Sequence, residues 1–374
     1  MSAKSPTPIL QFGTSRFLQA HFDLFVDEAL KNDQAIGPIT VVQSSGASAR
    51  SGRLAALAAE DGYPVKIRGL ENGSIVDREQ QIVSITRALS TATDWPKIVA
   101  IFVNEVEYLV SNTADAGYAP QPADKGDAFD QAMSFPAKLR LLLKERFLAH
   151  GRPLTIMPME LIPENGAVLR ACVLALAEQD DSDFQDWLQN RIIWVNSLVD
   201  RIVSEPIDPA GAICEPYALW AIENQPGLAL PCQHSAIELV DTLDDIEALK
   251  LFILNLGHTW LADRWQQQGS DRAMSVKTFL EDSETLNALQ GMYEAEVIPG
   301  FAAAGMEQRA RTYLATTIDR FRNPFLDHKL ADIAQNHRQK IERRIRGFVD
   351  WAQSHGDTTP KPALAALINK VPAP

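Results

Sequence analysis

Short apolar runs alternate with segments of helical periodicity through the first 205 residues of this 374-residue chain. The runs have strand length, and residues 63–89 carry the pattern of a hairpin with its turn at Glu71–Ser74. We expect strands at 8–12, 39–43, 98–103, 108–111, 154–157 and 192–195, and helices at 17–31, 51–59, 136–150 and from 165 onward. Strands separated by helices are typical of a parallel, doubly wound sheet.

From about Glu215 nearly every periodic segment is helical. Helices are expected at 244–265, 275–295, 308–321 and 328–351. Prolines 206, 209, 226 and 231 mark the change of pattern. The sequence therefore predicts an α/β protein, with a Rossmann-like dinucleotide-binding domain at 1–205 followed by a mainly α-helical substrate and catalytic domain at 206–374.

The formal net charge of −13 argues against a nucleic-acid partner or an anionic membrane surface, since both require a basic face. Three widely spaced cysteines form no Cys-x-x-Cys pair, which favours a reducing compartment and argues against a cysteine zinc site. No apolar run has the length of a signal peptide or a membrane span. We expect a cytoplasmic protein with a small-molecule partner and no bound metal; the sequence does not define its oligomeric state.

Three polar residues interrupt the apolar segment 250–262, namely Lys250, Asn255 and His258. At about 100° per residue, an α-helix places Lys250 and Asn255 about 140° apart with His258 between them, so that all three lie on one broad edge. A buried lysine with a lowered pKa serves as a general base. The competing interpretation is structural, because Lys250 can extend toward the acidic first turn at 244–247 and the other two can have ordinary core partners. The pattern alone leaves both interpretations open.

A weak nucleotide-binding pattern follows the first expected strand. Only Gly13 fits G-x-G-x-x-G, and Ser15 and Leu18 occupy the other glycine positions, so a plain strand–turn–helix connection is equally compatible. The second strand ends at Gln43 without an acidic residue for a ribose 2′-hydroxyl, and Arg50 follows it. Both NAD and NADP therefore stay open as cofactors.

The chain resembles the polyol-specific long-chain dehydrogenases, also called the mannitol dehydrogenase family, along most of its length. This family includes mannitol and mannitol-phosphate dehydrogenases and the fructuronate and tagaturonate reductases. Each matching motif is modest, but their order and spacing together are specific. The motifs are residues 11–21, 110–117, 134–139, 160–166, 196–202, 215–217 and 320–325, with the family signature K-x-x-x-x-N-x-x-H on Lys250, Asn255 and His258.

The resemblance implies a catalytic role for each signature residue. Lys250 would be the general acid/base of a reaction that needs no metal, Asn255 would donate a hydrogen bond to the developing alkoxide, and His258 would orient the reacting oxygen. Asp200, Arg320 and Arg322 are expected substrate contacts, although an Asp200–Arg201 ion pair and surface pairing of the two arginines are the competing interpretations. Cofactor contacts are expected from Gly13, Thr14, Ser15, Arg16, Phe17, Gln43, Ser44, Asn104, Asn112 and Thr113.

One departure from the family pattern bears on the substrate. Leu161 stands where mannitol 2-dehydrogenases carry an asparagine of the oxyanion hole, as we expect in the uronate reductases. The sequence therefore predicts an NAD(P)-dependent oxidoreductase, with NAD favoured, that interconverts a secondary alcohol and a ketone on a hexonate and keto-hexuronate, such as a mannonate or altronate oxidoreductase. The near alternative is a polyol or polyol-phosphate dehydrogenase of the mannitol, arabinitol or altritol type. A lysine Schiff-base aldolase or lyase and a non-catalytic dinucleotide-binding protein are alternatives from other classes.

Overall fold

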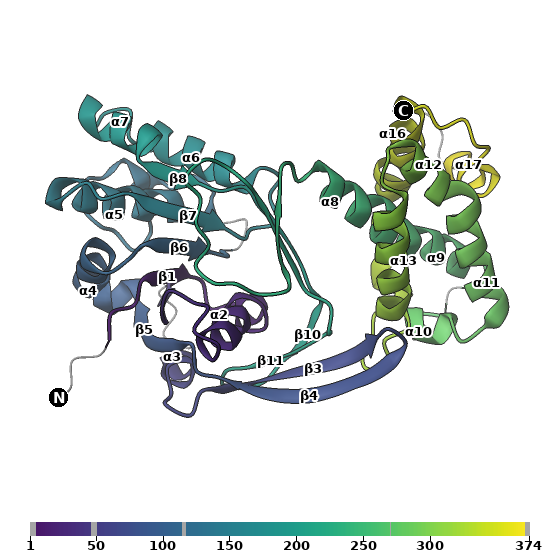
Figure 1. Cartoon of the computed structure of the whole chain (residues 1–374), viewed down its shortest axis with the longest axis horizontal. Helices are drawn as coiled ribbons and strands as arrows, with labels where there is room; N and C mark the ends of the chain where they lie inside the picture. Colours follow the sequence, from purple (N-terminus) through teal and green to yellow (C-terminus); the bar gives the residue numbers. More distant parts are fainter. Residues whose placement is uncertain (1–4, 46–50, 114–116, 270, 371–374) are drawn as a thin grey trace. The chain divides into compact units, whose positions relative to one another are not determined.

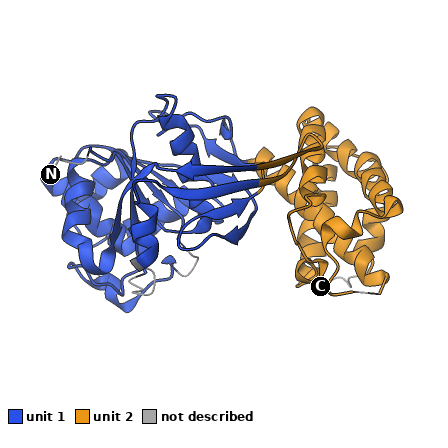
Figure 2. Cartoon of the chain, turned by 90° about the horizontal axis from the view of Figure 1, so that it is seen from below, with its two compact units in different colours: residues 1–67, 78–214, 218–243 blue, residues 68–77, 215–217, 244–374 orange. Residues whose placement is uncertain are grey.

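The computed structural model describes residues 5–45, 51–113, 117–269 and 271–370. The chain forms two compact units (Figure 2). Unit 1 comprises residues 1–67, 78–214 and 218–243, and unit 2 comprises residues 68–77, 215–217 and 244–374. The change of sequence pattern lies near residue 206, whereas the packing boundary along the main chain lies between residues 243 and 244.

Unit 1 is built on a six-stranded sheet with all neighbouring strands parallel (Figure 1). The strand order is β5-β2-β1-β6-β7-β8, which is the order typical of a dinucleotide-binding fold and reverses direction between β1 and β6. The central strands are buried along their whole length, as expected for parallel strands covered by helices. The strands are β1 Ile9–Phe12, β2 Ile39–Gln43, β5 Ile85–Ser90, β6 Tyr108–Ser111, β7 Leu154–Pro158 and β8 Ile192–Trp194. The predicted Rossmann-like sheet is confirmed.

The helices at 91–104, 135–149, 165–176 and 182–190 pack apolar faces on this sheet in one core cluster. Ser134 caps α5, because its Oγ accepts a hydrogen bond from the Ala137 backbone N–H at 3.3 Å. The helices are α1 Arg16–Gln19, α2 Phe22–Leu30, α3 Ser51–Leu57, α4 Thr91–Asn104, α5 Phe135–Ala149, α6 Asn165–Leu176 and α7 Ser182–Asn190.

Residues 98–103 are helical, so the strand predicted there is wrong. They lie in α4, whose buried Ile98, Ile101 and Phe102 recur at helical spacing. A short continuous apolar run has no period that distinguishes a buried strand from a buried helix. The strand that joins the sheet instead is β5, which begins within the segment 63–89 that was predicted as a hairpin.

The helix predicted at 17–31 is interrupted between α1 and α2. The guanidinium Nη1 of Arg201 donates a hydrogen bond to the Ala20 carbonyl at 2.6 Å. Since this carbonyl is held by a side chain distant in sequence, a local periodicity gives no sign of the break.

The predicted hairpin is formed by β3 Tyr63–Glu71 and β4 Ser74–Ile82. Asn72 and Gly73 between them have φ angles of 52° and 74°, which fits the left-handed residues of a type I′ turn. The described residues also form a sheet of order β10-β11-β3-β4 and a sheet of order β13-β12-β9. Their additional strands are β9 Ser197–Asp200, β10 Val203–Pro206, β11 Ala212–Cys214, β12 Leu219–Glu223 and β13 Ile237–Val240.

Residues 244–370 of unit 2 form helices, as predicted, and these helices surround one apolar core. Three of its helical segments are π-helical: Lys250–Asn255, Tyr293–Val297 and Ile341–Arg346. The α-helices are α8 Asp244–Leu249, α9 Leu256–Gln267, α10 Val276–Phe279, α11 Ser283–Met292, α12 Ile298–Ala303, α13 Glu307–Phe321, α14 Leu330–Ile333, α15 His337–Lys340, α16 Gly347–Ser354 and α17 Pro362–Ile368. The helices predicted at 275–295 and 328–351 are therefore each divided into shorter elements. Within the described ranges, no helix has the length and apolar character needed to cross a bilayer.

Candidate active site and cofactor pocket

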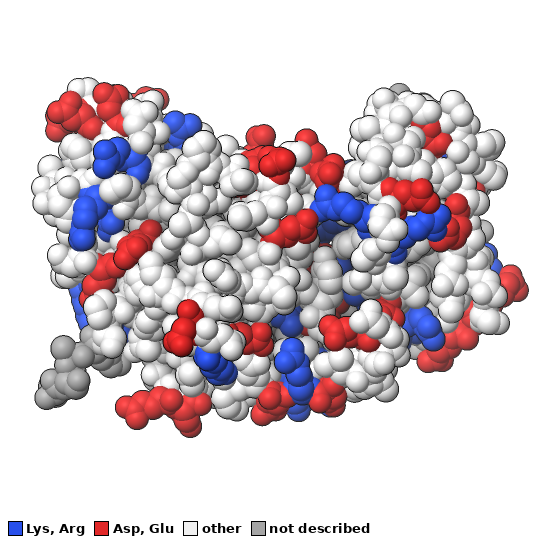
Figure 3. Space-filling model, in the orientation of Figure 1, with Lys and Arg blue, Asp and Glu red and all other residues white. Residues whose placement is uncertain are grey.

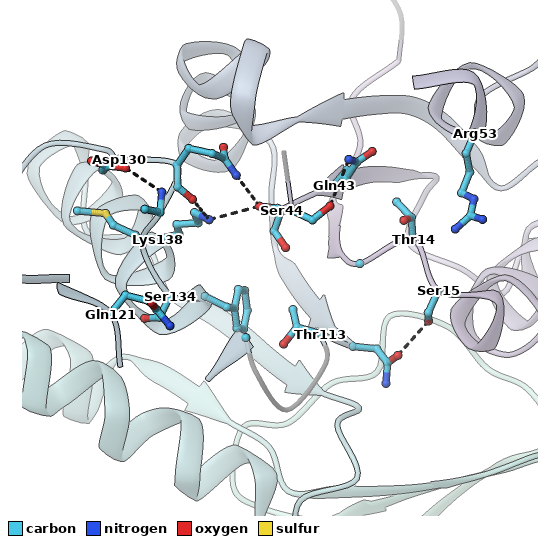
Figure 4. Close-up of a pocket in the computed structure, with 18 of the residues that line it drawn as sticks. Thr14, Ser15, Gln43, Ser44, Arg53, Thr113, Gln121, Asp130, Ser134 and Lys138 are labelled. Atoms are coloured by element: carbon cyan, nitrogen blue, oxygen red, sulfur yellow. Dashed lines mark hydrogen bonds between the residues drawn. The ribbon is translucent and has the colours of Figure 1, made fainter. Parts of the chain in front are cut away.

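A cavity of about 940 Å³ opens at the carboxyl end of the parallel sheet in unit 1, where the strand order reverses (Figure 4). Doubly wound sheets bind their ligands at this place. The cavity is lined by the turn after β1, the end of β2, the end of β6 and the first turn of α5. The lining includes Gly13, Thr14, Ser15, Arg16, Gln43, Ser44, Arg53, Asn112, Thr113, Ser134 and Lys138.

The turn after β1 requires glycine at its first position. Gly13 has a φ of +122°, and a Cβ there would lie 2.6 Å from the carbonyl oxygen of Asn112. Ser15, at the second position of the glycine pattern, caps α1 by accepting a hydrogen bond from the Leu18 N–H at 3.2 Å. Its hydroxyl also donates to Asn112 Oδ1 at 2.9 Å. A serine cap thus stands where the common fingerprint has a second glycine, and the turn still closes against β6.

Eight of the ten predicted cofactor residues line this cavity, and their contact with a cofactor stays a prediction. Phe17 and Asn104 are not among the lining residues. Phe17 stacks on the His21 ring at 4.7 Å. Asn104 is the last residue of α4 and donates from its amide to the Ala100 carbonyl at 2.7 Å, because the segment before it is a helix and not a strand. Arg50 lies outside the described residues.

Lys138 is a lining residue that the sequence reasoning did not single out. Its Nζ donates to the carbonyls of Ser44 and Gln131 at 3.3 and 2.9 Å, and burial lowers its pKa. Arg53 from α3 also lines the cavity. Lys138 belongs to the motif 134–139 that carried the family resemblance, so the resemblance could have indicated it as a cofactor residue. The loop around Gln131 has no periodic pattern from which its place in the cavity could have been predicted.

A buried carboxylate positions the end of β6. Glu160 accepts hydrogen bonds through Oε1 from the Thr113 backbone N–H at 2.9 Å and through Oε2 from the Ser111 hydroxyl at 3.1 Å. Burial raises its pKa, and these hydrogen bonds oppose the rise. Its neighbour Leu161 is 74% exposed, so an apolar side chain stands free of the core of unit 1 where the mannitol 2-dehydrogenase pattern has an amide.

The predicted catalytic residues lie on one continuous helical stretch of unit 2. Lys250 and Asn255 are half-buried, and His258 is 7% exposed. The predicted separation of 140° between Lys250 and Asn255 is wrong, because the stretch between them is π-helical. In a π-helix the hydrogen bonds join residues five apart, so Lys250 and Asn255 lie one turn from each other on the same side.

A tyrosine from another helix accounts for this π-helical stretch. The Tyr293 hydroxyl donates to the Ile253 carbonyl at 2.6 Å, and the Gly257 N–H hydrogen-bonds to the same hydroxyl oxygen. In an α-helix that N–H would donate to that carbonyl directly, so the hydroxyl is inserted into the backbone ladder. A Cβ at Gly257 would lie 1.9 Å from the Tyr293 oxygen, and glycine is therefore required.

His258 is a neutral imidazole at physiological pH. Burial lowers its pKa well below the ordinary value, and His328, Arg320, Arg344 and Lys340 lower it further because all are cationic or can become so. Its ring lies 4.6 Å from the Phe321 ring and 4.8 Å from the His328 ring. A neutral imidazole has one nitrogen that donates and one that accepts, which suits a residue that orients a hydroxyl.

The three predicted substrate residues have different surroundings. Arg320 is buried and pairs with Glu215, with Nη2 2.8 Å from Oε1, while its guanidinium lies over the Tyr217 ring at 4.5 Å. Arg322 is exposed at the end of α13. Asp200 is buried at the end of β9. Asp200 belongs to unit 1 and the two arginines to unit 2, and a role for any of them in substrate binding stays a prediction.

Known proteins resemble the chain over nearly its whole length. An altronate oxidoreductase of Halalkalibacterium halodurans is 30% identical over 400 aligned positions, which cover 98% of this chain and 76% of the relative. Altronate oxidoreductases of Yersinia pestis and Escherichia coli are each 31% identical, over 97% and 98% of this chain and 79% and 80% of the relatives.

Solved structures share the fold. A substrate-free D-sorbitol dehydrogenase superimposes with a TM-score of 0.82 at 21% identity, over 97% of this chain and 79% of that one. A Pseudomonas fluorescens mannitol 2-dehydrogenase in a ternary complex with NAD and D-mannitol gives 0.70 at 18% identity, over 98% and 78%. The family model of the mannitol dehydrogenase Rossmann domain matches residues 7–231, and that of the mannitol dehydrogenase C-terminal domain matches residues 242–369. The chain therefore belongs to the mannitol dehydrogenase family and is an NAD- or NADP-dependent oxidoreductase that acts on a CH–OH group.

Proposed function

We propose that this enzyme interconverts a hexonate and its keto-hexuronate, as an altronate or mannonate oxidoreductase does, with Lys250 as the general acid/base. The observation that carries the proposal is the placement of Lys250 and Asn255 one turn apart on the stretch that also bears the buried, neutral His258. The altronate oxidoreductases at 30–31% identity support the hexonate branch.

The cavity of unit 1 fits a nicotinamide dinucleotide. Gly13 lets the backbone pass close to β6, and residues of the first turns of α1 and α5 line the cavity. Gln43 ends β2 without a carboxylate, and Arg53 lines the same cavity, so the site admits a ribose 2′-hydroxyl or a 2′-phosphate. Bound there, the cofactor supplies the two-electron chemistry by taking a hydride from the alcohol carbon or returning it.

The residues of unit 2 handle the proton. In the oxidative direction Lys250 Nζ takes the hydroxyl proton, and in the reductive direction it gives one back to the carbonyl oxygen. Asn255 donates a hydrogen bond to that oxygen as negative charge develops. His258 holds the same oxygen or a neighbouring hydroxyl, and its low pKa keeps it from competing with Lys250 for the proton.

The partner and location follow the same proposal. On the face shown in Figure 3, acidic and basic side chains are interspersed. With a net charge of −13, this arrangement favours a small-molecule partner over nucleic acid or an anionic membrane surface. We place the enzyme in the cytoplasm.

A substrate screen at the NADH absorbance band tests the function. Altronate, mannonate, mannitol, arabinitol, altritol and the polyol phosphates are compared with both cofactors, and tagaturonate and fructuronate are compared in the reductive direction. We expect the highest kcat/KM for a hexonate and keto-hexuronate pair. A neutral polyol or a phosphate ester as the best substrate would overturn the hexonate assignment.

The role of Lys250 is tested separately. Lys250→Ala is expected to lower kcat by about 10²- to 10⁴-fold, as for loss of a general acid/base. NADH binding, followed by fluorescence titration, is expected to change by less than about 3-fold, because the cofactor is held by other residues. Comparable losses of NADH affinity and of rate would contradict this assignment, and borohydride trapping of a ketone substrate on Lys250 would instead favour Schiff-base chemistry.

A further inference from the structure

The cations Arg344 and Lys340 lower the pKa of buried His258, and the His328 ring lies 4.8 Å from the His258 ring. We infer that Arg344 and Lys340, with His328 beside them, form the site that binds the carboxylate of the substrate. This inference rests on the proposed function, because it assigns one end of the hexonate to a particular group of residues in unit 2.

Arg344 lies directly against the catalytic stretch. Its Nη1 donates to the Asn255 carbonyl at 3.3 Å and to the Thr259 hydroxyl at 3.2 Å. These two bonds fix the plane of the guanidinium one turn from the predicted catalytic residues. Among the described residues, its Nε and Nη2 have no hydrogen-bond or ion-pair partner. A planar guanidinium with an unpaired edge is suited to a bidentate carboxylate contact.

Lys340 lies four residues before Arg344 and adds a second positive charge. Lys340 Nζ donates to the Ile333 carbonyl at 2.7 Å and has no carboxylate within ion-pair distance in the described ranges. Its pKa is lowered by burial and by the positive charge of Arg344. The His328 ring lies 4.8 Å from that of His258. Burial lowers the pKa of His328, and Asp332 partly opposes this, so His328 offers the ligand a hydrogen bond more than a charge.

Carboxylates elsewhere on these helices are engaged with other cations. Glu342 pairs with Arg346 at 2.7 Å, and Asp263 pairs with Lys370 at 2.5 Å. Arg320 also faces His258, but its guanidinium is paired with buried Glu215. The positive charge of Arg344 and Lys340 is therefore left for a ligand, since half-buried cations are stabilised by an opposite charge.

A hexonate supplies that negative charge. It carries a carboxylate at one end and secondary hydroxyls along the chain, so a carboxylate bound at Arg344 and Lys340 would determine which hydroxyl reaches Lys250. A neutral polyol has no anionic group that could bind to this site. A polyol phosphate is also anionic, so comparing it with the hexonate tests whether the site prefers a carboxylate or a phosphate.

The test compares wild-type enzyme with Arg344→Gln and Lys340→Gln on three substrates: the best hexonate, the corresponding neutral alditol and the phosphate ester of that alditol. We expect Arg344→Gln to lower kcat/KM for the hexonate by about 10- to 100-fold, mainly through KM, because a charge-assisted bidentate contact is lost. Turnover of the alditol should fall by a smaller factor than that of the hexonate, so that the preference for the acid collapses. Lys340→Gln should act in the same direction, and Arg344→Lys should restore part of the preference because it keeps the charge.

Arg346→Gln is the matched control, since Arg346 lies two positions along the chain and is paired with Glu342. It should leave the ratio of acid to alditol activity unchanged. An unchanged ratio in both Arg344→Gln and Lys340→Gln would overturn the inference. So would a fall in kcat/KM for the phosphate ester relative to the alditol with no such fall for the hexonate.

Calorimetric titration of altronate into the enzyme with NADH provides a second readout that needs no turnover. Binding that weakens about 10-fold or more in Arg344→Gln and not in Arg346→Gln supports the carboxylate site. If wild-type enzyme turns over only polyols, the proposed function fails. The titration then still decides the inference, because altronate binding that does not depend on Arg344 overturns it.

Discussion

Tyr293→Phe removes the one hydroxyl that is inserted into the backbone of the catalytic helical stretch. This hydroxyl donates to the Ile253 carbonyl and accepts from the Gly257 N–H. Both backbone residues are buried, with Ile253 at 0% exposure, so water cannot replace the hydroxyl. The substitution keeps the ring and therefore isolates the hydrogen bonds from the packing.

The size of the effect follows from the two backbone groups. A buried donor or acceptor left without a partner costs about 1–3 kcal/mol, and two such groups cost about 2–6 kcal/mol. Part of this is offset because the variant no longer buries a hydroxyl, so a loss of about 2–4 kcal/mol in the free energy of unfolding is expected. The helix could close its own ladder from Gly257 to Ile253, but this would change the spacing of Lys250 and His258. If the helix rearranges in this way, the variant keeps its stability but its kcat falls.

Urea unfolding followed by circular dichroism, together with kcat on the best substrate, measures both consequences. Tyr108→Phe is the control, because the Tyr108 hydroxyl has no hydrogen-bond partner among the described residues, and its change should stay below about 0.5 kcal/mol. Gly257→Ala should be at least as damaging as Tyr293→Phe, although alanine ordinarily stabilises a helix by about 1 kcal/mol relative to glycine. If Tyr293→Phe alters neither the unfolding free energy by more than about 0.5 kcal/mol nor kcat, the inserted hydroxyl does not maintain the π-helical stretch.

Two further predictions concern unit 1. Burial raises the pKa of Asp23 to about 7, against an opposing hydrogen bond from the Tyr63 hydroxyl at 2.8 Å. The folded state therefore disfavours ionisation, and its stability should fall as pH rises from about 4 to 7, by at most about 4 kcal/mol at 1.36 kcal/mol per pKa unit. Asp23→Asn should remove this slope in urea unfolding between pH 4 and 8, and a variant with the wild-type slope would contradict the assignment. Gln43→Asp places a carboxylate at the end of β2, where it would accept from a ribose 2′-hydroxyl and repel a 2′-phosphate. It should raise the ratio of NAD to NADP kcat/KM by about 10-fold or more, as for one charge contact, and a ratio that moves toward NADP would contradict the placement of the adenosine ribose.

The sequence contained enough to predict the parallel sheet, because five of its strands are apolar runs bounded by turns or helices. It also identified the turn at Gly13, where a single glycine has a steric reason. The run at 98–103 was misassigned since a short buried helix and a short buried strand have the same composition. Local periodicity fails where the decisive partner is distant, as Arg201 is for the break after Ala20.

The candidate site shows the same limit. Lys250, Asn255 and His258 were found from their spacing and from the family signature, but an α-helical geometry was assumed for them. The π-helical stretch depends on Tyr293, which lies on another segment, and Gly257 was its only local sign. Arg344 and Lys340 could not be associated with the site, because only the packing of the Ile341–Arg346 segment against the catalytic stretch brings them there.

The inserted Tyr293 hydroxyl also sets a limit on how this helix can change in length. A π-helical turn holds about one residue more than an α-helical turn, so removal of one residue between Lys250 and Asn255 would let the backbone close an ordinary α-helical ladder and would leave the Tyr293 hydroxyl without its two backbone partners. Replacement of an apolar residue within the stretch keeps those two backbone groups in place. The number of residues in the stretch is therefore more tightly constrained than the identity of most of them.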